Sequence, residues 1–388
     1  MKNPHLKFFL LLFIHFSFSI ALPAQEKGEL LHRVYLIGDT GEDLFAGKTL
    51  KGLQNDLLAD SNSTVIFLGD NVYPKGVRKA LDIYNPIDLQ KLTLQLDLLQ
   101  EYKGNMYFIP GNHDWHKVGK KGYETLLNQA IYLEEYVKEK DFKLANLENG
   151  VFLPKPFGTP GPVKVVLPGD ILLILIDTEW LIHKSIGMKV GVSTEETSIV
   201  EEEKRFWKDL EEMISGASQR EIMFVAHHPM FSIGEHGSKS NGPDAGNALS
   251  KRLKSQELYG RGYNDFRQKA LQIINKSEKS IIYAAGHEHN LQYWNNQDEK
   301  HFIVSGAGSK HTAYYPKVQY KRWNLNLSEN PDQAVSLIYP KVKKKVKGKH
   351  VETGYFIINY YESGEKEIIM KDSGMSDFSE DGLLLWKD

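Results

Sequence analysis

Short runs of apolar, largely β-branched residues recur along this 388-residue chain, and they limit the folds that it can adopt. Most are continuous rather than alternating, which is typical of strands buried on both faces of a sheet. They occupy residues 34–37, 65–68, 107–109, 171–176, 222–226, 281–284 and 302–304. Helical patterns lie between them: the apolar residues of 199–214 share one face, and Leu89, Leu92, Leu96 and Leu99 predict another helix. Strands that alternate with helices predict an α/β fold.

Five polar motifs follow these runs in a fixed order. They are Gly38-Asp39-Thr40-Gly41, Gly69-Asp70-Asn71-Val72-Tyr73, Gly111-Asn112-His113-Asp114, Ala226-His227-His228-Pro229 and Gly286-His287-Glu288-His289. In α/β folds the functional groups gather just past the carboxyl ends of the strands, where all five motifs fall. The side chains able to bind metal are Asp39, Asp70, Tyr73, Asn112, His227, His287 and His289. One such motif is a weak signal, but the ordered set predicts a two-metal hydrolytic centre.

The first two motifs supply carboxylates and a phenol. Asp39 can reach a cation in the crevice, although an Asp at such a turn can instead cap the next helix. The two oxygens of Asp70 can bridge two cations and hold them roughly 3.5–4 Å apart, a spacing that lets both act on one phosphate. Tyr73 follows three residues later, so a short turn can bring its phenol beside the same ion, although most Tyr side chains serve only in packing.

The other three motifs supply an amide oxygen and imidazoles. Asn112 is a neutral, hard ligand and His113 can point at the substrate, although Gly-Asn and Asn-His are also common turn residues. His227 and His228 are adjacent on an extended chain and face opposite ways, so only one of them is expected to bind metal. The two imidazoles of the last motif are one residue apart and can serve neighbouring ions.

Ligand hardness divides the predicted centre into two sites. Carboxylates, a phenol and one imidazole favour a hard trivalent ion such as Fe(III), whereas a carboxylate, an amide and two imidazoles suit a divalent ion such as Zn, Fe(II) or Mn. Two ions can polarise phosphate oxygens and ionise a bound water near neutral pH. The centre is therefore expected to hydrolyse phosphate esters without a covalent protein nucleophile.

The N-terminus is typical of a secretory signal peptide, which we expect over residues 1–24. Lys2 and Lys7 precede a mostly apolar stretch that is too short to span a bilayer comfortably, so a secreted or periplasmic protein is predicted. The chain has no Cys, so a large core must replace disulfides, which favours a bacterial envelope location. The formal net charge of -2 gives no indication of nucleic-acid binding.

One catalytic domain is expected over residues 30–375, with a tail over 376–388. Residues 154–168 are rich in Pro and Gly and predict a loop. Residues 311–350 form a basic, Tyr- and Lys-rich insertion, which is more often a solvated surface than a flap that attracts anionic substrates. Two final strands, 355–360 and 367–371, are expected to close the domain.

These residues resemble the calcineurin-like metallophosphoesterases and, within them, the purple acid phosphatases. Most of that superfamily carries Asp-x-His in the first motif. Here Gly41 stands where the His would be and Tyr73 is present in the second motif, which is the purple acid phosphatase pattern. Two stretches resemble the small, tartrate-resistant type. They are Val225-Ala-His-His-Pro-Met-Phe-Ser-Ile-Gly-Glu-His236-Gly237, and Gly286-His-Glu-His-Asn-Leu-Gln-Tyr293 followed by Val304-Ser-Gly-Ala-Gly308.

The resemblance implies a two-sheet α/β-β-α sandwich with a single catalytic domain. It implies two metal ions, and the Tyr73 phenolate would give a purple charge-transfer band. His113 and His236 fall where the family places histidines that contact the substrate or donate a proton. The implied Fe(III) ligands are Asp39, Asp70, Tyr73 and His289, and the implied ligands of the divalent ion, Fe, Zn or Mn, are Asp70, Asn112, His227 and His287.

The implied reaction is hydrolysis of small phosphomonoesters, as in an acid phosphatase. A phosphodiesterase or pyrophosphatase on the same scaffold is an alternative, and so is a non-catalytic binding protein, although all seven ligand positions are filled. His228 replaces an aromatic residue common in the small type, and Trp115 follows Asp114 where mammalian sequences tend to have His. These differences bear on the expected substrate range and pH optimum rather than on the metal site.

Overall fold

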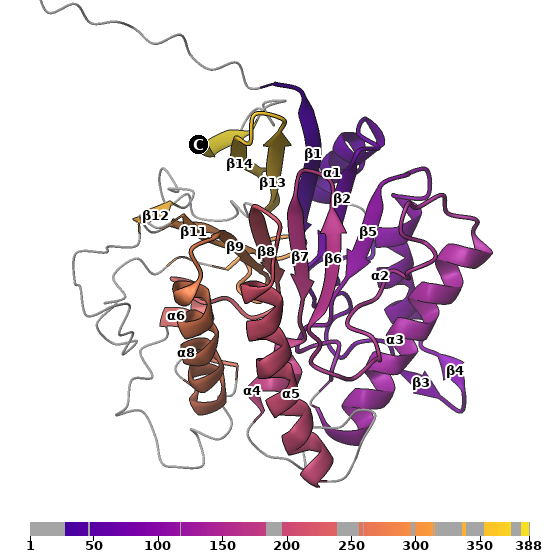
Figure 1. The fold of residues 1–388 in the computed structure, drawn as a ribbon. Helices are drawn as coiled ribbons and strands as arrows, with labels where there is room; N and C mark the ends of the chain where they lie inside the picture. The colour runs from indigo at the N-terminus through magenta and orange to yellow at the C-terminus, as the bar shows by residue number, and fades with distance from the viewer. Residues whose placement is uncertain are drawn as a thin grey trace, which may run out of the picture.

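The computed structural model describes residues 28–45, 47–116, 118–183, 196–238, 256–258, 260–295, 299–312, 314, 336–338, 353–373 and 382–387 (Figure 1). The predicted signal peptide and most of the 311–350 insertion lie outside these residues. Within them, we find no helix with both the length and the apolar character needed to cross a membrane.

The first of two central sheets has the strand order β15-β14-β13-β1-β2-β5. Its strands are β1 (Leu30–Ile37), β2 (Ser63–Phe67), β5 (Asn105–Phe108), β13 (Gly354–Tyr361), β14 (Lys366–Asp372) and β15 (Leu383–Lys387). β1, β2 and β5 are parallel, so their carboxyl ends meet at one edge of the sheet. β13 pairs antiparallel with β1, and β15 extends the sheet from within the segment expected to be a tail.

The second sheet has the order β12-β10-β11-β9-β8-β7-β6. Its strands are β6 (Val163–Leu167), β7 (Ile171–Leu175), β8 (Glu221–Val225), β9 (Ser280–Ala285), β10 (Leu291–Asn295), β11 (Lys300–Ser305) and β12 (Ser336–Ile338). β7, β8, β9 and β11 are parallel. A separate hairpin consists of β3 (Lys79–Ala80) and β4 (Ile83–Tyr84).

Strand β6 corrects the predicted loop over 154–168. Its Lys164 and Val166 are exposed, whereas the alternate residues Val163 and Val165 are half-buried and Leu167 is buried. This alternation is typical of an edge strand with one face toward solvent. The Pro and Gly residues earlier in the segment hid that pattern in the sequence.

The two sheets pack face to face, and alternate residues of each strand divide between two cores. Val34 and Leu36 of β1 lie in the core between the sheets, together with the matching residues of the second sheet. Tyr35 and Ile37 lie in the core that includes the helices. The continuous apolar runs are therefore buried on both faces, and the predicted two-sheet α/β-β-α sandwich is confirmed.

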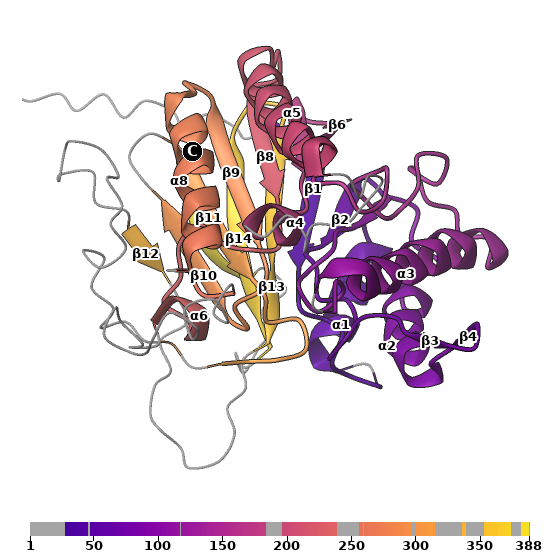
Figure 2. The same cartoon turned by 90° about the horizontal axis from the view of Figure 1, so that it is seen from below.

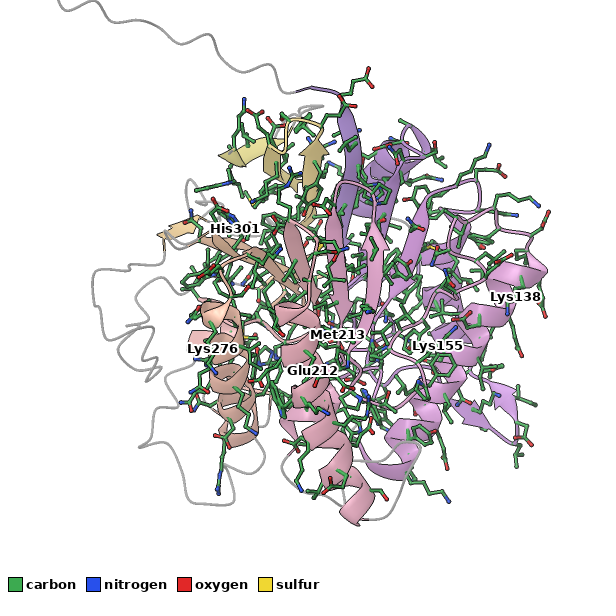
Figure 3. The ribbon with its side chains drawn as sticks, in the orientation of Figure 1. Lys138, Lys155, Glu212, Met213, Lys276 and His301 are labelled. Atoms are coloured by element: carbon green, nitrogen blue, oxygen red, sulfur yellow. The ribbon has the colours of Figure 1, made fainter. Side chains whose placement is uncertain are left out.

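Helices cover the outer faces of the paired sheets. Figure 2 shows α1, α2 and α3 on one side and α5 and α8 on the other. The helices are α1 (Lys48–Leu58), α2 (Pro86–Asp97), α3 (Gly119–Glu139), α4 (Thr178–Ile182), α5 (Glu196–Ser215), α6 (Glu235–Ser238) and α8 (Arg261–Lys276). Asn85 caps α2 by accepting the backbone N–H groups of Ile87 and Asp88. Lys138 and Lys276 lie in the last turns of α3 and α8, where a cation complements the helix dipole (Figure 3).

Candidate metal centre

The five motifs lie directly after parallel strands: β1, β2 and β5 in one sheet, β8 and β9 in the other. Because the sheets pack face to face, loops from both converge at one end of the sandwich. The loops are joined by hydrogen bonds, including the Asp39 N–H to the Gly69 carbonyl at 3.0 Å. The His287 N–H donates to Asp39 Oδ2 at 2.8 Å, which joins the two sheets directly.

Three of the candidate ligands have left-handed backbones. The φ angles are 58° at Asp39, 54° at Asp70 and 69° at His287. Non-glycine residues rarely adopt this region, and each instance costs of order 1–3 kcal/mol. The surrounding hydrogen bonds hold these conformations in place. Such strain concentrated at the meeting point of the loops is typical of a functional site.

Gly41 and Tyr73 are coupled through the backbone. The Gly41 N–H donates to the Asp70 carbonyl at 3.2 Å, and the Tyr73 N–H donates to the Gly41 carbonyl at 3.0 Å. A Cβ atom at position 41 would lie 2.3 Å from the carbonyl carbon of Asn71, so a side chain there requires the loops to separate. Gly41, at the position of the missing His, therefore allows the loop that carries Tyr73 to lie against the first motif.

Asp39, Tyr73 and His289 form what we call the oxygen-rich half of the centre. The Tyr73 hydroxyl donates to Asp39 Oδ1 at 2.7 Å and lies 3.0 Å from His289 Nε2. Burial and the Asp39 carboxylate raise the pKa of Tyr73 far above its usual value. A phenolate at this position would therefore need a bound cation to stabilise it.

Asn112, His227 and His287 form the imidazole half. Asn112 Oδ1 lies 3.0 Å from His227 Nε2 and 3.1 Å from His287 Nδ1. The opposite ring nitrogens face backbone carbonyls: His227 Nδ1 lies 2.8 Å from the Leu68 oxygen, and His287 Nε2 lies 2.9 Å from the Gln256 oxygen. A carbonyl only accepts, so these outer nitrogens carry the protons.

This tautomer assignment tests whether the residues fit a metal ion. In the neutral rings, the lone pairs of His227 and His287 point at a third acceptor, the Asn112 oxygen. Three converging lone pairs repel one another unless a cation lies between them. Burial disfavours a charged His227, yet the carboxylates of Asp70 and Asp39 outweigh burial and raise its pKa. Burial, together with His236, His228 and His227, holds the pKa of His287 well below its usual value, so that ring is neutral. An amide oxygen and imidazole nitrogens are donors that fit a borderline divalent ion.

Asp70 contacts both halves. Its Oδ1 lies 3.5 Å from His227 Nε2. Asp70 also clusters with Asp39 and His289, and one ligand atom from each of the three lies within 4.8 Å of the others. The His113 N–H also donates to Asp70 Oδ1 at 2.8 Å. Burial opposes its charge, but His227 and His113 lower the pKa of Asp70, so it is a carboxylate. This placement suits a bridging ligand.

The two remaining predicted histidines border the centre. The His113 ring is 35% exposed, its Nδ1 lies 2.7 Å from the Pro74 carbonyl, and its Nε2 lies 4.0 Å from Asp70 Oδ2. The His236 ring stacks on His287, with ring centroids 4.3 Å apart. All nine predicted site residues thus lie in one region of the molecule.

His228 differs from its neighbour, as expected for adjacent residues. Its ring is buried, its Nδ1 lies 2.8 Å from Thr178 Oγ1 and its Nε2 lies 2.8 Å from Gln256 Oε1. The His228 nitrogens also lie near those of His227 and His287. The inner nitrogens of His227 and His287 face only the Asn112 oxygen, which cannot donate, whereas His228 has a hydroxyl donor at one nitrogen and an amide oxygen acceptor at the other. We therefore assign His228 to the support of the centre and not to the metal.

Other contributing residues were not assigned by the sequence. Asp114 accepts the backbone N–H groups of Gly111, Asn71 and Val72 at 2.8 to 3.2 Å, and so ties the second and third motifs together. Its place in the third motif was a signal for such a role. Glu288 accepts Ser232 Oγ and the Gly237 N–H, both at 2.8 Å, which holds the loop that carries His236.

The fold and the site define the class of protein. The profile described as calcineurin-like phosphoesterase matches residues 32–291, so this chain belongs to the calcineurin-like phosphoesterase family. Purple acid phosphatase 17 of Arabidopsis thaliana is 22% identical over 298 residues, which cover 74% of this chain and 71% of that protein. The predicted family resemblance is confirmed.

Two solved structures are also similar. A dimetal phosphatase from Danio rerio gives a TM-score of 0.45 at 10% identity, over 89% of this chain and 96% of that one. The structure of PhoD gives a TM-score of 0.49 at 9% identity, over 92% of this chain and 69% of that one. Family membership implies a metal-dependent phosphoesterase with two metal ions, which agrees with the donor chemistry found at the strand ends.

Proposed function

We propose that this chain is an exported phosphatase of the purple acid type that hydrolyses small phosphomonoesters. The observation that carries the proposal is the placement of Tyr73, whose hydroxyl lies 2.7 Å from Asp39 Oδ1 and 3.0 Å from His289 Nε2. A carboxylate, a phenol and an imidazole form a hard donor set that favours Fe(III). The imidazole half would take a divalent ion, Fe, Zn or Mn.

When bound, two such ions would polarise the phosphate oxygens and lower the pKa of a water molecule. The residues of the chain would do the remaining work. The Nδ1 proton of His113 is held by the Pro74 carbonyl, so the ring can present Nε2 to the substrate beside Asp70.

His236 would supply a proton to the leaving alcohol. Burial lowers the pKa of its ring, but Glu257 and Glu288 outweigh burial and raise it to about 9. A proton carried on this ring could pass to the leaving alcohol, which is the role of a general acid. Glu257 Oε1 lies 3.6 Å from His236 Nδ1.

Metal analysis, a visible absorption spectrum and a substrate panel test the proposal. The purified protein should contain about two metal ions per chain, one of them iron, and should be coloured. Tyr73→Phe should remove the colour and leave the fold intact. A colourless, iron-free wild type would refute the Fe(III) assignment. Faster cleavage of a diester or of pyrophosphate than of p-nitrophenyl phosphate would replace the monoesterase proposal.

A further inference from the structure

A buried carboxylate lies behind the imidazole half and has no part in the proposed reaction. Strand β7 is followed by Asp177-Thr178-Glu179, where Asp177 caps α4 and the next two residues begin it. The Glu179 side chain is only 2% exposed. The His183 Nε2 atom lies 2.7 Å from Glu179 Oε1. The Gln256 side-chain amide donates to both Glu179 oxygens, at 3.2 and 3.1 Å. Burying a charge without such partners would be strongly unfavourable.

The Gln256 side chain is held at both ends. Its Nε2 donates to Glu179, and its Oε1 accepts His228 Nε2 at 2.8 Å. Because an amide oxygen accepts, His228 carries its proton on Nε2, and its Nδ1 accepts the Thr178 hydroxyl at 2.8 Å. The side-chain polar atoms of Gln256 and His228 therefore each have a defined role and direction.

The backbone carbonyl of Gln256 connects this hydrogen-bond network to the metal centre. Its carbonyl accepts His287 Nε2 at 2.9 Å, which leaves the lone pair of Nδ1 directed at Asn112. The His228 ring also packs against His287, with centroids 4.5 Å apart. A shift of Gln256 would free the His287 ring to rotate or to change tautomer.

We propose that Glu179 is a positioning residue that fixes His287 through Gln256 and His228, and that it raises metal affinity in the imidazole half alone. The proposal rests on the two-metal function proposed above. It also gives His228 a role. A phenyl ring at this position could pack on His287 but could not donate to Gln256 Oε1. Outer contacts of this kind typically change metal affinity 10- to 100-fold.

The test compares Glu179→Ala, Glu179→Gln and Gln256→Met in the full chain, loaded with metal and then dialysed against a chelator. Wild type should keep two ions. Glu179→Ala and Gln256→Met should keep one, with the affinity for added Zn(II) lowered about 10- to 100-fold and the Tyr73 absorption unchanged. Glu179→Gln should retain most of the affinity, because its amide oxygen can still accept the Gln256 amide.

Glu221→Ala is the control matched to Glu179→Ala. Glu221 is also a buried carboxylate, and it pairs with Lys366 at 3.2 Å at the start of β8, the end of the strand opposite the motif loops. Its loss should lower thermal stability without changing metal content. If Glu179→Ala fails to fold, Gln256→Met decides the question. Two ions retained at wild-type affinity, or both ions lost in parallel, would overturn the proposal. A wild type that binds fewer than two ions would instead refute the two-metal function itself.

Discussion

The two halves of the metal centre differ in how they are held. The donors of the oxygen-rich half contact one another directly: the Tyr73 hydroxyl donates to Asp39 Oδ1 and lies 3.0 Å from His289 Nε2. Both halves are buried: Asp39 and Tyr73 are 0% and 1% exposed, and His227 and His287 are 0% and 2% exposed. The imidazole half differs in its supports. Its rings are oriented by carbonyl groups of Leu68 and Gln256.

The two halves therefore differ in which residues position their donors. The donors of the oxygen-rich half are placed mainly by the loops that carry them, whereas the imidazole half also depends on a network that starts at α4. Substitutions in that network should therefore affect one metal site, and substitutions at the residue shared by both halves should affect two.

The largest effect is expected at the shared residue. Asp70→Ala should remove both ions and lower turnover of a chromogenic monoester by at least about a thousandfold, since the Asp70 carboxylate contacts both halves. His227→Ala should abolish turnover while leaving the metal of the oxygen-rich half in place. Elemental analysis and steady-state kinetics measure both results. Retained activity in Asp70→Ala would contradict the shared-ligand assignment, and retained activity in His227→Ala would contradict the assignment of His227 to the imidazole half.

A smaller effect is expected at His236. His236→Ala should lower kcat about 10- to 100-fold, the range of a lost general acid, with little change in metal content. If the ring mainly supports His287, on which it stacks, metal content and kcat should fall together. Comparing kcat with bound metal in the same preparations distinguishes a proton donor from a support.

The side chains that converge in the two halves could be predicted because each is a distinctive residue type that follows an apolar run. The supports of the imidazole half could not, because backbone carbonyls such as that of Gln256 carry no residue-type signal. The run 171–176 was recognised, yet Asp177-Thr178-Glu179 after it lacks His and Asn and was not singled out. The sequence likewise gave no means of knowing that Glu179 and Gln256, 77 residues apart, make contact.

The support beneath the imidazole half should depend on pH. Burial raises the pKa of Asp177 to about 7, although it accepts Trp115 Nε1 at 2.7 Å and the Trp180 N–H at 3.1 Å. A carboxyl whose pKa is raised on folding holds its proton more tightly in the native state. Asp177 therefore lowers the free energy of unfolding as pH rises from about 4 to 7, by up to about 4 kcal/mol.

Asp177→Asn should remove this pH dependence. The variant loses one hydrogen bond at all pH values, which adds an offset of about 1–2 kcal/mol. The free energy of unfolding of the variant should nevertheless rise relative to that of the wild type between pH 4 and pH 7. Urea unfolding at several pH values measures the slope, and parallel curves for the two proteins would refute the prediction.

The smallest effect is expected at Lys310. Its Nζ lies 3.5 Å from the Tyr73 ring centroid and 2.9 Å from Glu42 Oε2. Lys310→Met should move the predicted Tyr73 band to longer wavelength, because a cation over the ring stabilises its electrons. Activity should change by less than about tenfold, since partly exposed cation–π contacts contribute about 0.5–1 kcal/mol. Lys310→Arg should keep the wild-type band, and an unchanged band in Lys310→Met would rule out the effect.

The pairing of β13 with β1 has a consequence for the order of folding during synthesis. β1 lies between β2 and β13 in the middle of its sheet, yet more than 300 residues separate it from β13 in the chain. Until those later residues leave the ribosome, β1 has an open hydrogen-bonding edge, and such edges promote aggregation. The loops that bring Asp39 and Asp70 together would therefore settle only late, once translation has reached the final strands.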